Sequence, residues 1–316
     1  MRLWMTLLRR EWWEHRGGFL WTPLAILALV LLGAGLTLSL ASSNEAQLSY
    51  QIEEQAGADS ASRAFEWRGN LLELLDFSQW STPVFSRRAA QFRAFVAQPF
   101  ILAHFLVAVF VLLGTLHEDR KDRSVLFWKS MPVSDAETVF SKLILAVWVA
   151  PLVTIAAILL AQIGTLLLLT TAGLAADASG IGHTWMHAGI PNGAVTLITG
   201  YLVQGLWALP VYAWLLLVSA AAPKVPFVWA LLVPMGLSAL ESIALGSSAL
   251  SSWIKAHLGF AALPRPESVD DGLVRPGVGL AEQISLLFSA DMAIGLAAAA
   301  VLLAGAVRFR ARNNDL

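Results

Sequence analysis

Residues 118–142 read EDRKDRSVLFWKSMPVSDAETVFSK and form a charged island between two long apolar runs. On either side, the chain reads as membrane-embedded helix or as loops that join such helices. Of its 316 residues, 57% are hydrophobic and only 14% are charged, and the mean hydropathy is +0.66. A soluble domain carries about 25% charged residues. The composition therefore predicts an all-α, polytopic membrane protein with the island outside the apolar layer.

Six stretches are long and apolar enough for a spanning helix, which needs about 20 residues. They are residues 19–41, 99–116, 143–170, 194–222, 227–246 and 286–307. None of them contains Lys or Arg. We therefore expect residues 1–316 to form a single transmembrane domain with six transmembrane helices, the first of them uncleaved.

The distribution of charge predicts how these helices are oriented. Segments 1–18, 117–142, 223–226 and 308–316 carry 13 of the 21 Lys and Arg residues, although the opposite loops are together about twice as long. Lys and Arg concentrate on the cytoplasmic side of membrane proteins. Both termini and the island are therefore expected to be cytoplasmic, most simply in a bacterial inner membrane. The net charge of −1 and the lack of Cys give no indication of a nucleic-acid partner, a disulfide or a thiolate metal site.

Residues 1–18 predict an interfacial elbow helix. Leu and Trp residues of MRLWMTLLRREWWEHR fall on one broad helical arc with Arg residues opposite, as in a helix that lies in the lipid headgroup layer. Glu11 and Glu14 interrupt the apolar arc and are expected to face a protein partner instead of lipid. The alternative is a basic leader that only fixes topology.

Two outer segments are too long to be simple connectors. In residues 42–98, the apolar positions from Phe85 to Val96 have helical spacing and predict a surface helix that runs into the second span. Residues 71–75 indicate another helical piece. This segment either packs over the spans or lines an exit path. Residues 247–285 are expected to begin with a short helix that dips into the outer leaflet and then to continue irregularly.

The island predicts a helix, a break and a second helix. Residues 125–128 are four consecutive large apolar residues, which need a cover in a cytoplasmic loop. Pro132 ends this first helix, and Ser134 with Glu137 matches the S-x-x-E capping box that starts another. The cover is lipid, the protein's own helix ends or a second protein.

Few residues within the spans carry chemistry. Glu241 and Asp291 are acids within apolar runs, where such groups are costly and mark functional sites by default. We treat them as candidate pathway residues, the alternative being that each hydrogen-bonds a neighbouring helix end or reaches the outer interface. His183 and His187 have i, i+4 spacing, but no acid lies between them and nearby Gly residues oppose a stable helix, so no metal site is expected. His104 lies within the second span without an evident partner.

At the island the sequence resembles the ABC-2 type permease family, the membrane subunits of type V ABC exporters. The family's loop after its second span runs from an acid over five residues to Ser/Thr, then an apolar stretch, Ser/Thr-x-Pro-Val/Ile-Ser, and a Lys that opens the third span. The matching positions are Glu118, Ser124, residues 125–128, SMPVS at 130–134, and Lys142. LLRREWWEHR at 7–16 also resembles the family's elbow helix, whereas the long segment 42–98 departs from the family pattern.

The resemblance implies a non-enzymatic permease subunit whose island is a coupling helix that docks on a separate ABC ATPase. ATP and Mg would bind that ATPase, with no cofactor and no catalytic residue on this chain; the phosphate loop G-x-x-x-x-G-K-[ST] is indeed missing from the sequence. A second permease copy or a homologous permease is also implied. The residues implied to contact the ATPase are Glu118, Arg120, Arg123, Leu126, Phe127, Trp128, Pro132 and Ser134.

Two other classes stay open. A secondary transporter or channel driven by an ion gradient would need buried charges near the midplane and often shows internal repeats; no convincing repeat is present, and Glu241 and Asp291 lie off centre. An intramembrane enzyme would need a nucleophile and base, or a metal set, at one depth.

Overall fold

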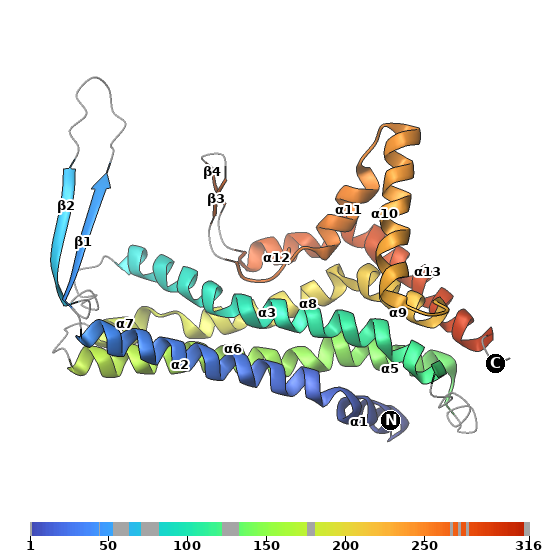
Figure 1. Cartoon of the computed structure of the whole chain (residues 1–316), viewed down its shortest axis with the longest axis horizontal. Coiled ribbons are helices and arrows are strands. Elements are labelled where there is room, and N and C mark those ends of the chain that lie inside the picture. The colour runs from blue at the N-terminus through green and yellow to red at the C-terminus, as the bar shows by residue number, and fades with distance from the viewer. Residues whose placement is uncertain are drawn as a thin grey trace.

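A computed structural model of the chain describes residues 2–43, 45–52, 63–70, 82–121, 133–175, 181–265, 268–270, 273–275 and 278–312. Long helices lie side by side in a bundle from which two β-hairpins project (Figure 1). The start of α1 and the end of α13 lie at the same end of this bundle, as the predicted even number of spans requires.

The first part of the chain makes three long helical passages, two of which contain a π-helical turn. Their elements are α1 (Arg2–Arg16), η1 (Gly17–Trp21) and α2 (Thr22–Ser43), then α3 (Thr82–Lys121), then α5 (Asp135–Ile144), η4 (Leu145–Val149) and α6 (Ala150–Ala175). The second part is broken into shorter helices. They are α7 (Ile181–His187), α8 (Ile190–Trp207), α9 (Leu209–Ala221), α10 (Pro226–Leu245), α11 (Ala249–Leu258), α12 (Leu280–Leu287) and α13 (Ala290–Arg312).

Among the described residues, five passages are long and apolar enough to cross a membrane, or six if α8 and α9 are one span. The chain is therefore an integral membrane protein with helical spans, in agreement with the sequence. The fourth predicted span is bent by 51° between α8 and α9, where Pro210 cannot donate a backbone hydrogen bond. The sixth starts later than predicted because Ser289 interrupts it: its Oγ accepts the N–H of Met292 at 3.1 Å and starts α13.

The helix predicted from Phe85 to Val96 is confirmed, and it continues through Pro99 as the 40-residue helix α3. Phe85 and Val96 are buried, as their helical spacing requires. The short helix expected after the fifth span is confirmed as α11. The helical piece expected at 71–75 lies outside the described residues.

Two cores hold the bundle together. The larger one lies where α3, η4, α9 and α13 meet, around Leu112, Leu145, Leu216 and Ala299, each 0% exposed. The second one joins α3, α6 and α8 towards the opposite end of these helices. The break between α8 and α9 lies against η4, since a Cβ at Gly205 would be 2.8 Å from Val147 Cγ1.

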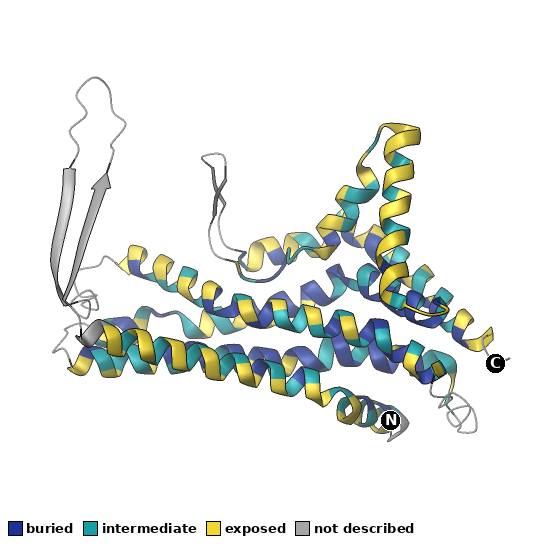
Figure 2. Cartoon of the chain, viewed as in Figure 1, coloured by how far each residue is buried: buried dark blue, intermediate teal, exposed yellow. Residues whose placement is uncertain are grey.

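Helix α10 stands away from the bundle together with α11, and its side chains are exposed along its length (Figure 2). These side chains are mostly apolar, including Leu232, Met235 and Ile243. In a membrane protein such a face contacts lipid or another membrane-embedded chain.

Two β-hairpins that were not predicted lie in segments connecting the helices of the all-α membrane domain. Strand β1 (Glu45–Ile52) pairs antiparallel with β2 (Arg63–Asn70), and β3 (Ser268–Asp270) pairs with β4 (Leu273–Arg275). In the sequence, Leu48, Tyr50 and Ile52 alternate with polar residues, and the residues of β2 alternate likewise. Such alternation is typical of a strand, but the helical spacing elsewhere in residues 42–98 favoured a helical interpretation. The predicted spans are helical, and the strands belong to the connecting segments.

Helix α8 makes a close backbone contact that predicts a specific loss of stability. A Cβ at Gly200 would lie 2.8 Å from the carbonyl oxygen of Ala262 and 2.8 Å from Gln283 Nε2. Gly200→Ala should therefore lower the free energy of unfolding by about 1–3 kcal/mol, the usual cost of overpacking. Thermal unfolding in detergent measures the effect.

The matched control is Gly236→Ala in α10, where a Cβ meets nothing within 4 Å. Because Gly inside a helix costs about 0.5–1 kcal/mol relative to Ala, this variant should be neutral or slightly more stable. Equal unfolding temperatures for the two variants would contradict the packing described for α8.

Candidate functional site

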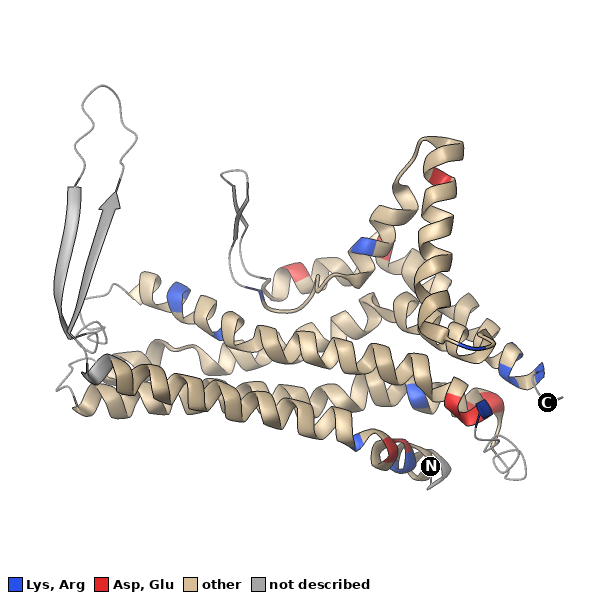
Figure 3. Cartoon of the chain, in the orientation of Figure 1, with Lys and Arg blue, Asp and Glu red and all other residues tan. Residues whose placement is uncertain are grey.

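Charged side chains of the described helices gather at one end of the bundle, where α1, the end of α3, α5 and the end of α13 meet (Figure 3). Most of the length of the helices carries neither acid nor base. Several charged side chains at this end are nevertheless buried, which distinguishes them from an ordinary solvated face.

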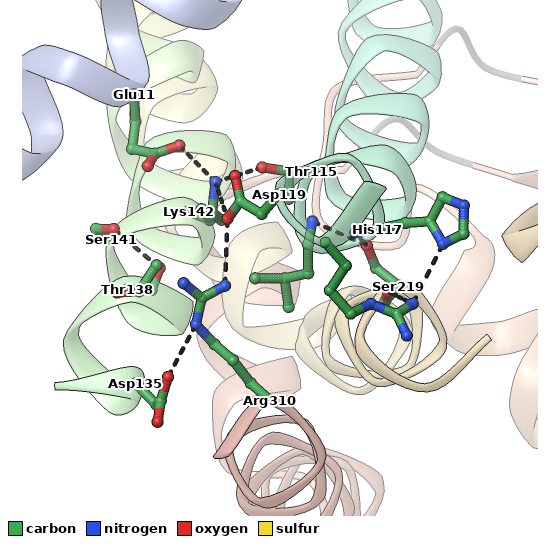
Figure 4. Close-up of polar contacts among 12 residues, drawn as sticks. Glu11, Thr115, His117, Asp119, Asp135, Thr138, Ser141, Lys142, Ser219 and Arg310 are labelled. Atoms are coloured by element: carbon green, nitrogen blue, oxygen red, sulfur yellow. Dashed lines mark hydrogen bonds and ion pairs between the residues drawn. The ribbon is translucent and has the colours of Figure 1, made fainter. Parts of the chain in front are cut away.

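Lys142 of α5 is the centre of this cluster and is only 1% exposed. Its Nζ donates to Glu11 Oε2 of α1 at 3.1 Å and to Thr115 Oγ1 of α3 at 2.6 Å. Asp119 Oδ2 lies 3.5 Å from the same nitrogen. Three helices are thus tied together through one ammonium group (Figure 4).

Arg310 of α13 joins the two helices that flank residues 122–132. Its Nη1 donates to Asp119 Oδ2 at 3.2 Å, and its Nε donates to Asp135 Oδ1 at 3.1 Å (Figure 4). Asp119 lies in the last turn of α3 and Asp135 is the first residue of α5. One guanidinium therefore contacts both helices that flank residues 122–132.

The sequence spacing explains why these groups meet. Thr115 and Asp119 are four residues apart on α3, and Asp135 and Lys142 are seven apart on α5, so each pair lies on one helix face. The register of α5 is set by the predicted capping box, which is confirmed: Ser134 Oγ accepts the Glu137 N–H and the Glu137 carboxylate accepts the Ser134 N–H.

The charges of the cluster are balanced. The carboxylates of Glu11, Asp119 and Asp135 face the cations Lys142 and Arg310, and Arg10 Nη1 lies 3.6 Å from the second oxygen of Glu11. Burying a charge costs several kcal/mol unless it is paired and hydrogen-bonded. The expectation that Glu11 faces a partner protein is wrong, because this carboxylate is 0% exposed against the chain's own Lys142.

A second polar contact ties α3 to the end of α9. The Oγ of Ser219 accepts the backbone N–H groups of Leu116 and His117 at 3.0 and 3.1 Å. Arg120 Nη2 donates to the carbonyl oxygens of Ser219 and Ala222 at 3.0 and 2.8 Å, where the last carbonyls of a helix favour a cation.

The predicted contact residues of the island are only partly described. Glu118 is exposed at the end of α3, Arg120 is engaged with α9, and Ser134 is exposed within its capping box. The others lie outside the described residues: Arg123, Leu126, Phe127, Trp128 and Pro132.

The two acids predicted for a pathway lie on separate helices. The Glu241 carboxylate accepts the N–H of Leu250 at 3.0 and 3.2 Å, in the first turn of α11. Asp291 is exposed in the first turn of α13, where an acid complements the helix dipole. The Glu241 contact agrees with the alternative of a hydrogen bond to a neighbouring helix end, whereas the position of Asp291 decides between neither interpretation.

The histidines have partners that the sequence did not indicate. His104 Nδ1 lies 3.3 Å from Thr154 Oγ1, and its ring contacts Tyr201. His183 and His187 do lie on a helix, α7, contrary to prediction, with ring centroids 4.3 Å apart.

Among the described residues, one group has metal-ligand atoms within 4.8 Å of one another: Glu11, Glu14 and His15. Lys142 and Arg10 already face the Glu11 carboxylate.

Comparison with known proteins gives no match to a family model, to a curated protein or to a solved structure.

Removing the central cation should destabilise the chain strongly. Lys142→Met leaves Glu11 and Asp119 buried without it, and we expect the free energy of unfolding to fall by about 3–5 kcal/mol. Glu11→Gln combined with Lys142→Met should cost less than Lys142→Met alone, since one buried charge is then neutralised. Denaturant unfolding of the two purified variants and of the wild-type protein measures these differences.

The control is Lys224→Met, at an exposed lysine between α9 and α10. Its effect should stay within about 0.5 kcal/mol, as for most surface substitutions. If Lys142→Met were as mild as this control, the cluster would not be a buried ionic site.

Proposed function

We propose that this chain is the transmembrane permease subunit of an ATP-driven ABC exporter, in which a separate ATPase supplies the energy. The observation that carries the proposal is the double contact of Arg310 with Asp119 and Asp135. Added to it is the resemblance of residues 118–142 to the coupling loop of ABC-2 permeases.

The geometry supports a transmitting role for residues 122–132. Their two stems, the end of α3 and the start of α5, are held by one guanidinium, so a force on the segment acts on both helices together. Lys142 extends the connection to α1, and Arg310 extends it to α13. A docking ATPase would thus move four helices as one unit.

The ion-driven alternative receives less support. A secondary transporter holds ionisable side chains near the middle of the membrane. In the described part of the chain, the buried charges lie at one end of the helices (Figure 3). This is the arrangement expected when the driving event takes place outside the membrane.

The proposal includes further partners and a location. ATP and Mg belong to the ATPase, and a second permease, identical or homologous, completes the transporter. Exposed apolar side chains along α2 and α10 are available for that copy and for lipid. The charged end faces the cytoplasm of a bacterial inner membrane, with Arg308, Arg310 and Arg312 following the positive-inside rule.

Phe127 and Trp128 provide the test. If the apolar run of the island is buried against an ATPase, Phe127→Ala with Trp128→Ala should reduce the ATPase that co-purifies from the native membrane at least roughly tenfold, because buried aromatic anchors each carry 2 kcal/mol or more. Mild-detergent purification and quantitative mass spectrometry give the ratio of the two chains.

Phe140→Ala is the matched control, since Phe140 is a partly exposed aromatic of α5 that lies outside the apolar run at residues 125–128. This variant should keep the wild-type ratio. Stoichiometric ATPase on the double variant, or stable turnover of the chain with no ATPase at all, would overturn the proposal.

A further inference from the structure

A cavity of about 330 Å³ lies between α3, α6 and α8, next to Pro264 and Gly279. Continuous helix separates Gln162, in its wall, from Lys142 by 20 residues, or about 30 Å. This is about the thickness of the hydrocarbon core. The cavity therefore lies about one membrane core away from the ionic cluster, towards the opposite boundary.

The wall of the cavity is positively charged. It contains Arg87, Arg93 and Arg265, and its described lining includes no Asp or Glu. The neighbouring Glu282 carboxylate accepts the N–H of Gly279 at 3.0 Å and so serves the start of α12. The guanidinium groups of Arg93 and Arg265 beside one small space favour an anion.

Arg93 belongs to α3, and its guanidinium reaches the start of α8, where a cation is electrostatically unfavourable. Its Nη1 donates to the carbonyl oxygen of Ala188, and its guanidinium lies over Gly189 and Gly193. A Cβ at Gly193 would be 2.6 Å from Arg93 Nε, so glycine is needed for this approach. The N-terminus of a helix itself attracts anions. Arginine and helix together make a site that lacks its negative charge.

Gln162 gives a second indication of the chemistry of the bound molecule. It is only 6% exposed, and its Nε2 donates to the carbonyl oxygen of Arg93 at 3.1 Å. This bond fixes the amide orientation and leaves Oε1 as a buried acceptor without a hydrogen-bond partner in the described part of the chain. Buried acceptors are normally satisfied. A hydroxyl group on the bound molecule would satisfy it.

We propose that this cavity binds a phosphate-bearing polyol, with the phosphate held by the arginines and the start of α8 and a hydroxyl donated to Gln162. The volume is at the lower end of the range for small-molecule sites, about 300–1,000 Å³. Either a glycerophosphate-type lipid headgroup or a soluble polyol phosphate has this chemistry. The inference does not depend on an ATPase partner, because it concerns the isolated chain.

The test measures binding to the full-length protein in detergent by microscale thermophoresis. The probes are dioctanoyl phosphatidylglycerol, dioctanoyl phosphatidylcholine and glycerol 3-phosphate. Phosphatidylglycerol should bind and phosphatidylcholine should not, since the latter is zwitterionic and has no headgroup hydroxyl. Binding of glycerol 3-phosphate as well identifies a site for the free headgroup, whereas its failure to bind identifies a lipid site.

Arg265→Gln and Arg88→Gln separate the cavity from general surface charge. Both arginines are exposed, but only Arg265 lines the cavity. Arg265→Gln should weaken binding of phosphatidylglycerol roughly tenfold, the effect of losing one charge-assisted hydrogen bond. Arg88→Gln should leave it unchanged.

Equal weakening by both variants would overturn the proposal, as would equal binding of the two lipids. Gln162→Leu, which keeps every charge, should weaken phosphatidylglycerol without creating affinity for phosphatidylcholine. Because these readouts use the isolated chain, they can succeed or fail whether or not an ATPase co-purifies.

Discussion

The burial of the Lys142 ammonium constrains the rest of this structure. An ammonium removed from water is tolerated only when carboxylates and other acceptors surround it, and no single helix can supply enough of them. Glu11, Thr115 and Asp119 come from two other helices, so the three must meet at one point. Arg310 then closes the group because Asp119 serves both cations.

The two ends of the bundle have different chemistry as a result. At the charged end, acids and bases are balanced within the chain, and Arg310 pairs with both helices that flank residues 122–132. At the other end, the described wall of the cavity has cations without acids. Helices α3 and α6 connect the two ends without interruption, apart from η4 below α6. A balanced end suits a permanent protein contact, whereas an unbalanced one suits a ligand that comes and goes.

Much of the fold could be predicted from the sequence because spanning helices have a direct compositional signal. The helical spans, five or six in the described residues, followed from hydropathy, as did the helix from Phe85 from periodicity and the capping box at Ser134 from spacing. The hairpin β1–β2 did not follow, because its short period-two alternation lies in the same long segment as the stronger helical spacing from Phe85 to Val96. Starts and breaks of helices are decided by single residues such as Ser289 and Pro210, whose effect hydropathy averages out.

The candidate site was less predictable. Lys142 was singled out by its motif, and Glu11 by its misplaced position on an apolar arc, but nothing in one sequence indicates that they pair. Contacts between residues 131 positions apart depend on how helices pack. Thr115 with Asp119 and Asp135 with Lys142 were visible as same-face pairs, a signal that would have marked one layer of the bundle. The cavity was hidden for the same reason, because α3, α6, α8 and the segments at Pro264 and Gly279 form it only after folding.

The contact of η4 with the break between α8 and α9 has a mechanical consequence. A helix resists bending because every turn is tied to the next, and both passages lose that regular ladder where Gly205 meets Val147. These two passages are therefore easier to bend at this level than a regular helix is, whereas α3 is continuous from Thr82 to Lys121. Bending between the charged end and the cavity end is therefore expected in these two passages, where the regular ladder of hydrogen bonds is broken.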